Sequence, residues 1–286
     1  KENGNIEDYE YEGIKNTLIK NNIYLGKVSR IEPSLQAAFI DFGRERHGFL
    51  SFNDIQSDYY QIPSSDLEKI KEEEKQVREE LAKQSEKEET EIENDKNDNE
   101  LDEKKPELEN QIEGRFKKSK APSKRYKIQE VIKPNQVILV QVLKDERGLK
   151  GAALTTFISI AGKYIVLMPN TPKGGGISRK IFNSGDRKKI RSILNEIDIP
   201  KEMGLIVRTA GSNKTKNEIN HDLETLKSTW NQIKELAINS IAPSLIHQES
   251  EIIKRTLRDM YDENTKNIIV EGNEGYKKAQ SFMKIL

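Results

Sequence analysis

Residues 22–52, NIYLGKVSRIEPSLQAAFIDFGRERHGFLSF, are the stretch that decides the fold. They predict three short strands separated by turns: Ile23–Ile31, Ala37–Phe42 and His47–Phe52. Two further strands are predicted far downstream, at Val137–Leu143 and Lys150–Thr156, with a turn between them. Five short strands interrupted by a long insertion at a loop predict a small closed β-barrel such as an OB-fold.

The insertion is acidic, and it hides the charge of the rest of the chain. The 286 residues include 48 Lys and Arg against 48 Asp and Glu, so the formal net charge is zero. Residues 66–113 contain 9 basic and 20 acidic side chains, which leaves a net charge of +11 on the other 238 residues. A nucleic-acid binder is therefore not excluded, because the body of the protein is basic.

We interpret the stretch from about residue 64 to residue 123 as a surface-loop insertion. It lacks the apolar periodicity needed to offset its ordering entropy. Residues 66–89 could form a solvated helix rich in Glu–Lys pairs, and residues 90–114 are predicted to be disordered. The alternatives are a partner-binding tail and an RNA mimic.

Composition excludes several other classes. The chain has no Cys, so it has no disulfide framework and no thiolate metal site. No apolar run approaches the ~18 residues of a membrane span, and the start of the chain is too polar for a signal peptide. The three His lack ligand spacing, and the Gly-rich loops at 174–176 and 211–215 lack phosphate-loop spacing. Because the chain starts without Met and ends without a closing signal, we expect a fragment.

Three aromatic residues of the predicted barrel lie among basic side chains. They are Phe39, Phe42 and Phe49, interleaved with Lys27, Arg30, Arg44, Arg46 and, from the last strand, Lys150. Exposed rings beside cations are typical of single-stranded RNA binding, since bases stack on the rings and the cations hold phosphates. The alternative is that all three rings are core. Because side chains alternate along a strand, one of Phe39 and Phe42 should point away from the core.

The middle of the chain predicts an α/β unit. Its expected elements are strands at 158–160 and 164–168, a loop at 171–176, helices at Asp186–Ile197 and Lys216–Asn239, and a strand within Gly204–Gly211. Arg208-Thr209 at that strand end offers a planar fork and a hydroxyl suited to phosphate. Backbone N–H groups near Gly162 could complete an anion pocket. The alternative is an ordinary strand end.

The last part predicts two helices, Glu251–Tyr261 and Asn273–Phe282, around a buried strand at Ile268–Val270. Its acidic residues are expected on a solvated helix and not in a catalytic cluster: Glu249, Glu251, Asp259, Asp262 and Glu263.

These motifs resemble the ribonuclease E/G family. Glu32-Pro33-Ser34-Leu35 and Ala37-Ala38-Phe39 are narrower signals than the strand spacing and Gly-Phe pair shared by S1-type domains. The resemblance covers nearly the whole chain outside the acidic block. It implies an α+β multi-subdomain fold: an S1-type OB-fold barrel at 18–156 and a 5′-sensor domain at 157–252, both inserted in a partial RNase H-like domain made of residues 1–17 and 253–286.

The resemblance also implies site residues. In the family, the positions matching Phe39, Phe49 and Lys150 contact RNA, and the aromatic pattern adds Phe42 as a candidate. The terminal 5′-monophosphate is held there by the positions matching Gly162, Val166, Arg208 and Thr209. The stretch 157–162 favours the ribonuclease E branch over the ribonuclease G branch.

The implied activity is endoribonucleolytic hydrolysis of single-stranded RNA in rRNA processing, tRNA processing and mRNA decay. In the family, the aspartates that bind catalytic Mg²⁺ and the Cys pair that binds Zn²⁺ between protomers lie downstream of residue 286. No catalytic or metal residue is therefore expected within this chain, which should bind RNA without cutting it.

The implied partners are single-stranded RNA with a 5′-monophosphate, further copies in a homo-oligomer (a tetramer in the family), and components of an RNA-degradation complex. The implied location is the cytoplasm or the periphery of the inner membrane. The alternative function, from another class, is a non-catalytic RNA-binding or assembly protein.

Overall fold

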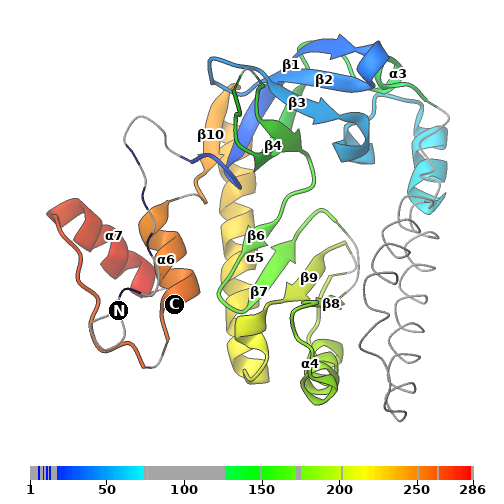
Figure 1. Ribbon diagram of the computed structural model, residues 1–286. Helices are drawn as coiled ribbons and strands as arrows, with labels where there is room; N and C mark the ends of the chain where they lie inside the picture. Colours follow the sequence, from blue (N-terminus) through cyan, green and yellow to red (C-terminus); the bar gives the residue numbers. More distant parts are fainter. Residues whose placement is uncertain are drawn as a thin grey trace, which may run out of the picture.

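The computed structural model describes residues 18–73, 76, 126–148, 150–171, 175–200, 202–249, 251–262 and 264–284, together with residues 6, 9, 11 and 13. In Figure 1 these form a β-barrel at the top, an α/β unit below it and two helices at the left. Most of the predicted segment 1–17 and of the acidic insertion lies outside the described residues. The described start of the insertion is helical over residues 64–73.

Five strands form the barrel: β1 (Ile23–Glu32), β2 (Ala37–Asp41), β3 (Gly48–Ser51), β4 (Val137–Lys144) and β5 (Ala153–Thr155). Their order is β1-β2-β3-β5-β4, and β4 also pairs with β1, which closes the barrel. The pair β3–β5 is parallel and the others are antiparallel. The topology is consistent with the predicted OB-fold, although the last strand begins at Ala153 and not at Lys150.

Apolar residues on the inner face fill the barrel. Val28, Ile40 and Leu50 have no exposed surface. Gly26 is required where β1 crosses the core, because a Cβ there would lie 2.5 Å from the Ile40 side chain. The turns around the barrel are the short helices η1 (Pro33–Leu35), η2 (Phe52–Asp54), η3 (Ser57–Tyr59) and α3 (Ile128–Val131).

A second sheet, with its own core, lies below the barrel. Its order is β6 (Ile160–Ala161), β7 (Ile165–Met168), β9 (Gly204–Val207) and β8 (Gly175–Ile177). Two sequence predictions were wrong in part here. Ile158 and Ser159 precede β6 without being in a strand, and Gly175-Gly176 belong to β8 because they pair in parallel with β9.

Two helices accompany this sheet, α4 (Ser184–Glu196) and α5 (Lys216–Asn239). The bounds of α5 match the prediction because a capping box fixes its start: the Thr215 hydroxyl accepts from the Glu218 N–H, and the Glu218 carboxylate accepts from the Thr215 N–H. The α4 helix starts two residues earlier than predicted, where the Asn183 side chain accepts from the Gly185 N–H. The last short helix of this unit is η6 (Thr209–Gly211).

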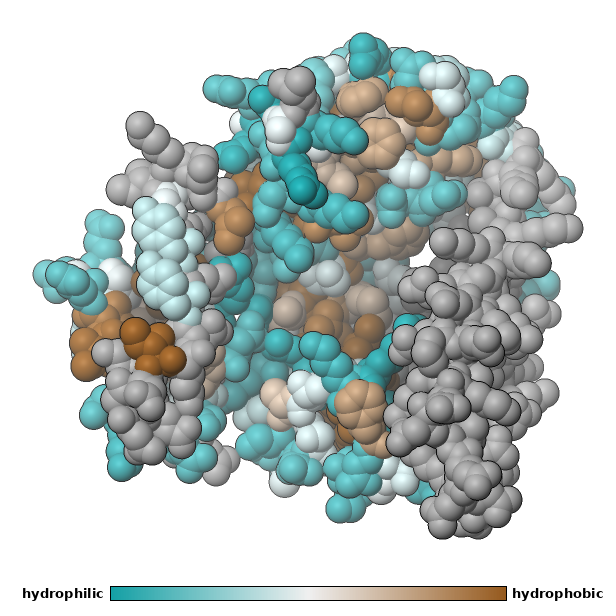
Figure 2. All heavy atoms as spheres, viewed as in Figure 1, coloured by the Kyte–Doolittle hydropathy of each residue, from teal (hydrophilic) through white to brown (hydrophobic). Residues whose placement is uncertain are grey.

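The last part of the chain returns to the barrel and then forms two helices. The strand β10 (Ser244–His247), which was not predicted, pairs antiparallel with the start of β1. It is followed by α6 (Ile252–Met260) and α7 (Asn273–Met283). The predicted buried strand Ile268–Val270 is wrong: these residues are not in a strand, and Ile269 is 94% exposed. Figure 2 shows hydrophobic residues on the surface of this part.

The described helices include none that is both long and apolar enough to cross a membrane.

Candidate functional site

Two of the predicted RNA-contacting aromatics meet on the outer face of the barrel. Phe39 on β2 and Phe49 on β3 are register partners, and both are half-buried. Their ring centroids are 6.1 Å apart at an interplanar angle of 75°. The Arg30 guanidinium lies over the Phe39 ring, 4.7 Å from its centroid. The barrel therefore presents two partly open rings together with a cation.

The third aromatic is not available for stacking. Phe42 is 1% exposed and makes an edge contact with Tyr24 in the barrel core, with ring centroids 5.1 Å apart. A base cannot reach a ring in that position, so the inclusion of Phe42 among the RNA-binding residues needs correction. The alternation argument itself is confirmed, because Phe39 points outward while Phe42 points inward.

Lys150 is exposed. It lies in the segment that leads into β5, and this segment runs beside Phe49. Two residues after Lys150, the Ala152 carbonyl accepts a hydrogen bond from the Phe49 N–H at 2.8 Å. The loop before Lys150 is tied to the loop after β2, since Arg46 Nη1 donates to the Gly148 carbonyl and Arg44 pairs with Glu146 at 3.8 Å. The two loops, with their basic residues, thus lie side by side.

Arg208 follows β9 and contacts the loop that contains Gly162. Its side chain is 29% exposed, and its Nη1 donates to the Gly162 carbonyl at 2.7 Å. Thr209 begins η6 and is exposed, while Val166 lies on β7 opposite Ile206 of β9. The structure therefore brings Arg208, Thr209 and Gly162 together, with Val166 on the adjacent strand.

The backbone N–H groups of this loop already have an anionic partner. Lys163, Tyr164 and Ile165 donate their N–H groups to the Asp222 carboxylate of α5 at 3.3, 2.8 and 3.1 Å. The prediction that these groups complete a phosphate pocket needs correction. Gly162 gives this carboxylate room, because a Cβ there would lie 2.6 Å from both Asp222 oxygens. Sequence reasoning missed Asp222, since nothing local marks a contact made across 59 residues.

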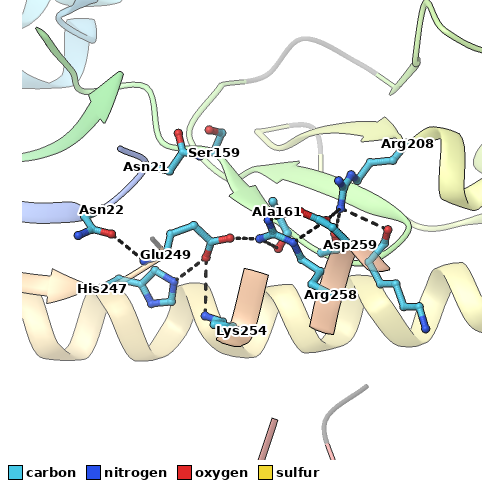
Figure 3. A network of polar contacts seen from close by, with 12 residues as sticks. Asn21, Asn22, Ser159, Ala161, Arg208, His247, Glu249, Lys254, Arg258 and Asp259 are labelled. Carbon is cyan, nitrogen blue, oxygen red and sulfur yellow. Dashed lines mark hydrogen bonds and ion pairs between the residues drawn. The ribbon is translucent and has the colours of Figure 1, made fainter. Parts of the chain in front are cut away.

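An ion-pair network continues from Arg208 into the protein (Figure 3). Asp259 Oδ1 accepts from Arg208 Nη1 at 2.8 Å. Arg258 holds the same carboxylate with two bonds, from Nε at 3.0 Å and from Nη2 at 3.1 Å. Arg258 Nη1 then donates to Glu249 and, at 3.3 Å, to the Ala161 carbonyl. The network therefore joins β6, β9 and α6.

Glu249 is the buried end of this network. It is 4% exposed, and its carboxylate also contacts His247 Nε2 at 3.2 Å and Lys254 Nζ at 3.6 Å. The expectation of a solvated helix face is wrong for Glu249, which precedes α6 and is buried, whereas Asp259 does lie on an exposed part of α6. Both are counter-ions of Arg258, whose burial at 8% exposed requires a charged partner.

The network holds its carboxylates ionised. Burial raises the pKa of Glu249, but the hydrogen bond from His247 and the charges of Lys254 and Arg258 outweigh burial, so its pKa lies below the ordinary value. Burial also raises the pKa of Asp259, and the hydrogen bonds from Arg258 and Arg208 lower it by more. The net direction for Asp259 is again downward.

The described residues include no group of three or more His, Cys, Asp or Glu side chains that could hold a metal ion. The acidic side chains of this region instead pair with arginines and lysines.

Fold and site together define a class: an OB-type barrel with an aromatic and cationic outer face, joined to an α/β unit that holds a half-buried arginine. The family model of the Ribonuclease E/G family matches residues 159–286. The chain is 36% identical to ribonuclease E of Haemophilus influenzae over 93% of its length, and 37% identical to ribonuclease E of Buchnera aphidicola over 98%. It is 36% identical to ribonuclease E of Escherichia coli over 93%.

The chain belongs to the ribonuclease E/G family. It spans 22%, 24% and 20% of these three relatives, respectively.

Proposed function

We propose that this chain is the RNA-binding and 5′-monophosphate-sensing part of an endoribonuclease that hydrolyses single-stranded RNA in RNA processing and mRNA decay. Family membership supports the nuclease class. The observation that supports end sensing best is the placement of Arg208. Its guanidinium is half-buried, is fixed by carbonyl and carboxylate acceptors, and adjoins the exposed Thr209. Arginine beside a hydroxyl suits a phosphate that carries about −1.5 to −2 charges.

In this proposal the barrel binds the body of the RNA strand. Phe39 and Phe49 offer ring surface for bases, and Arg30 and Lys150 offer charge for phosphates. Base stacking on exposed rings tolerates any sequence, because every base has an aromatic face. The barrel would therefore supply affinity, while Arg208, Thr209, Gly162 and Val166 would distinguish the 5′ end.

We divide the chain in the same way. Residues 18–156 would be the S1-type barrel and residues 157–252 the sensor, with residues 1–17 and 253–286 as parts of an RNase H-like domain. We assign Mg²⁺-dependent hydrolysis and a Zn²⁺ link between protomers to the full-length protein. We also expect that protein to form a homo-oligomer, to join a degradation complex and to act in the cytoplasm. We expect this chain alone to bind RNA without cleaving it.

The test compares a short single-stranded RNA that carries a 5′-phosphate with its 5′-hydroxyl twin. We expect the wild-type protein to prefer the phosphorylated RNA and Arg208→Ala to lose that preference. Lys227→Ala on α5 is the matched control, since it also removes one cation, from a pair with Glu224. Equal affinity of the wild type for both RNAs would refute end sensing. Cleavage by the full-length protein would exclude the non-catalytic alternative.

A further inference from the structure

The Arg208 side chain is held by one of its three nitrogens. Within the described part of the chain, Nη1 makes every hydrogen bond of the guanidinium: to the Gly162 carbonyl at 2.7 Å, the Lys163 carbonyl at 3.4 Å and Asp259 Oδ1 at 2.8 Å. The N–H groups of Nε and Nη2 point along the other edge of the plane and form a two-pronged donor. The anchoring thus leaves the Nε–Nη2 edge unused. This is the edge that can bind an oxyanion with two hydrogen bonds.

In the same network, the Nε–Nη2 edge of Arg258 binds a carboxylate. Its Nε and Nη2 bind the two oxygens of Asp259 at 3.0 and 3.1 Å, while its Nη1 is anchored by Glu249 and the Ala161 carbonyl (Figure 3). The two arginines are therefore held in the same manner. Arg258 has a carboxylate on its two-pronged edge, and the equivalent edge of Arg208 has no partner among the described residues.

Asp259 is itself firmly placed. Arg258 fixes both of its oxygens and is 8% exposed, and the Glu249 carboxylate behind it is 4% exposed. A side chain that is held in place by its own hydrogen bonds can fix the orientation of a side chain that it contacts. The negative charge of Asp259 would oppose a phosphate nearby, but Arg258 balances that charge.

We propose that Asp259 is a positioning residue for 5′-phosphate recognition. By binding Nη1 it turns the Nε–Nη2 edge of Arg208 toward the terminal phosphate, which then receives two charge-assisted hydrogen bonds. This role rests on the proposed end-sensing function. It makes a residue of α6, 51 positions after Arg208, a determinant of specificity for 5′-monophosphate over 5′-hydroxyl ends.

The experiment measures the dissociation constants of the full-length protein for both RNAs, without added Mg²⁺ so that hydrolysis does not compete. For Asp259→Ala we expect the preference for the phosphorylated RNA to fall about tenfold, with the affinity for the hydroxyl RNA unchanged. Asp259→Asn retains an oxygen that can accept from Arg208 Nη1, so it should restore part of the preference. Asp262→Asn, on an exposed carboxylate that bonds Thr265, is the matched control and should leave the preference unchanged.

Three results would overturn the proposal. Tighter binding of the phosphorylated RNA by Asp259→Ala would mean that Asp259 competes with phosphate for Arg208. An equal loss of affinity for both RNAs in Asp259→Ala and Asp259→Asn would mean a merely structural role. An unchanged preference in Asp259→Ala, with the preference lost in Arg208→Ala, would refute the positioning role alone. Absence of any preference in the wild type would instead refute the end-sensing function.

Discussion

The two regions proposed to meet RNA differ in how the protein holds their side chains. Phe39 and Phe49 are held by contact with each other and with Arg30, on the open face of a barrel. Arg208 is held by two carbonyls and by Asp259, whose partner Arg258 is nearly buried. The first region is adaptable, whereas the second is fixed before a ligand arrives.

Under the proposed function, this difference would divide the work between affinity at the rings and specificity at Arg208. A stacking surface accepts any base and gains little from exact placement. Recognition of one terminal phosphate needs an arginine already turned to the right angle, because orienting it during binding would cost affinity. The protein therefore places its buried ion pairs behind the arginine and not behind the rings.

The strongest test of this comparison removes the buried end of the network. Glu249→Gln removes the more deeply buried of the two counter-ions of Arg258, so the free energy of unfolding should fall by about 3–5 kcal/mol. Unfolding by denaturant measures this loss of free energy. Glu224→Gln, which breaks an exposed pair with Lys227 on α5, should cost less than about 1 kcal/mol. Similar losses for both variants would contradict the assignment of Glu249 as the buried counter-ion of Arg258.

The next test concerns the loop that carries the Arg208 acceptor. In Gly162→Ala the new Cβ would meet the Asp222 carboxylate, which three backbone N–H groups hold in place. We expect a loss of about 1–3 kcal/mol in thermal or denaturant unfolding, as for other overpacked sites. Gly176→Ala is the matched control, because its nearest neighbour would be the Ile206 side chain at 3.5 Å. If Gly162→Ala is no less stable than that control, Asp222 does not fix the loop.

The barrel side of the comparison is tested by RNA binding. Phe39→Ala should weaken binding by about 1–3 kcal/mol, to the same extent for phosphorylated and hydroxyl RNA, because it removes one stacking surface. Fluorescence anisotropy with labelled RNA measures both affinities. Leu35→Ala, at an exposed position of the same barrel, should leave them unchanged. A loss confined to phosphorylated RNA would contradict the division of work.

The smallest expected effect is the pH dependence of stability. The pKa values of Glu249 and Asp259 lie below their ordinary values of 4.5 and 3.8. Their stabilising contribution is therefore fully present above about pH 5 and is lost as the pH falls through the lower folded-state values. Acid unfolding should be less steep for Asp259→Asn than for the wild type. A steeper transition for the variant would contradict the assigned direction of the shift.

Most of the barrel could be predicted from the sequence because β1 to β3 follow one another, as do β4 and β5, and their turns are marked by Pro33, Gly43 and Gly148. The start of α5 was readable from Thr215 and Glu218, since a capping box is local. β10 was missed because its four residues pair with a strand more than two hundred positions earlier.

The candidate site was also predictable only in part, because local sequence patterns can be read and contacts between distant residues cannot. Arg208-Thr209 and the Phe39–Phe49 pair stand out by residue type and by resemblance. The partners that orient Arg208 do not, because Asp222 and Asp259 contact the site only through the tertiary fold. Likewise, the β-branched run Ile268–Val270 looked buried, but within the described residues it has no partner strand.

The most direct test of the central claim is the ratio of affinities for 5′-phosphorylated and 5′-hydroxyl RNA in the wild type, Phe49→Ala and Arg208→Ala. We expect Phe49→Ala to weaken both affinities by one common factor, so that the ratio keeps its wild-type value. In Arg208→Ala the ratio should fall to about one, with the affinity for hydroxyl RNA unchanged. A ratio altered by Phe49→Ala, or equal losses for both RNAs in Arg208→Ala, would contradict the account.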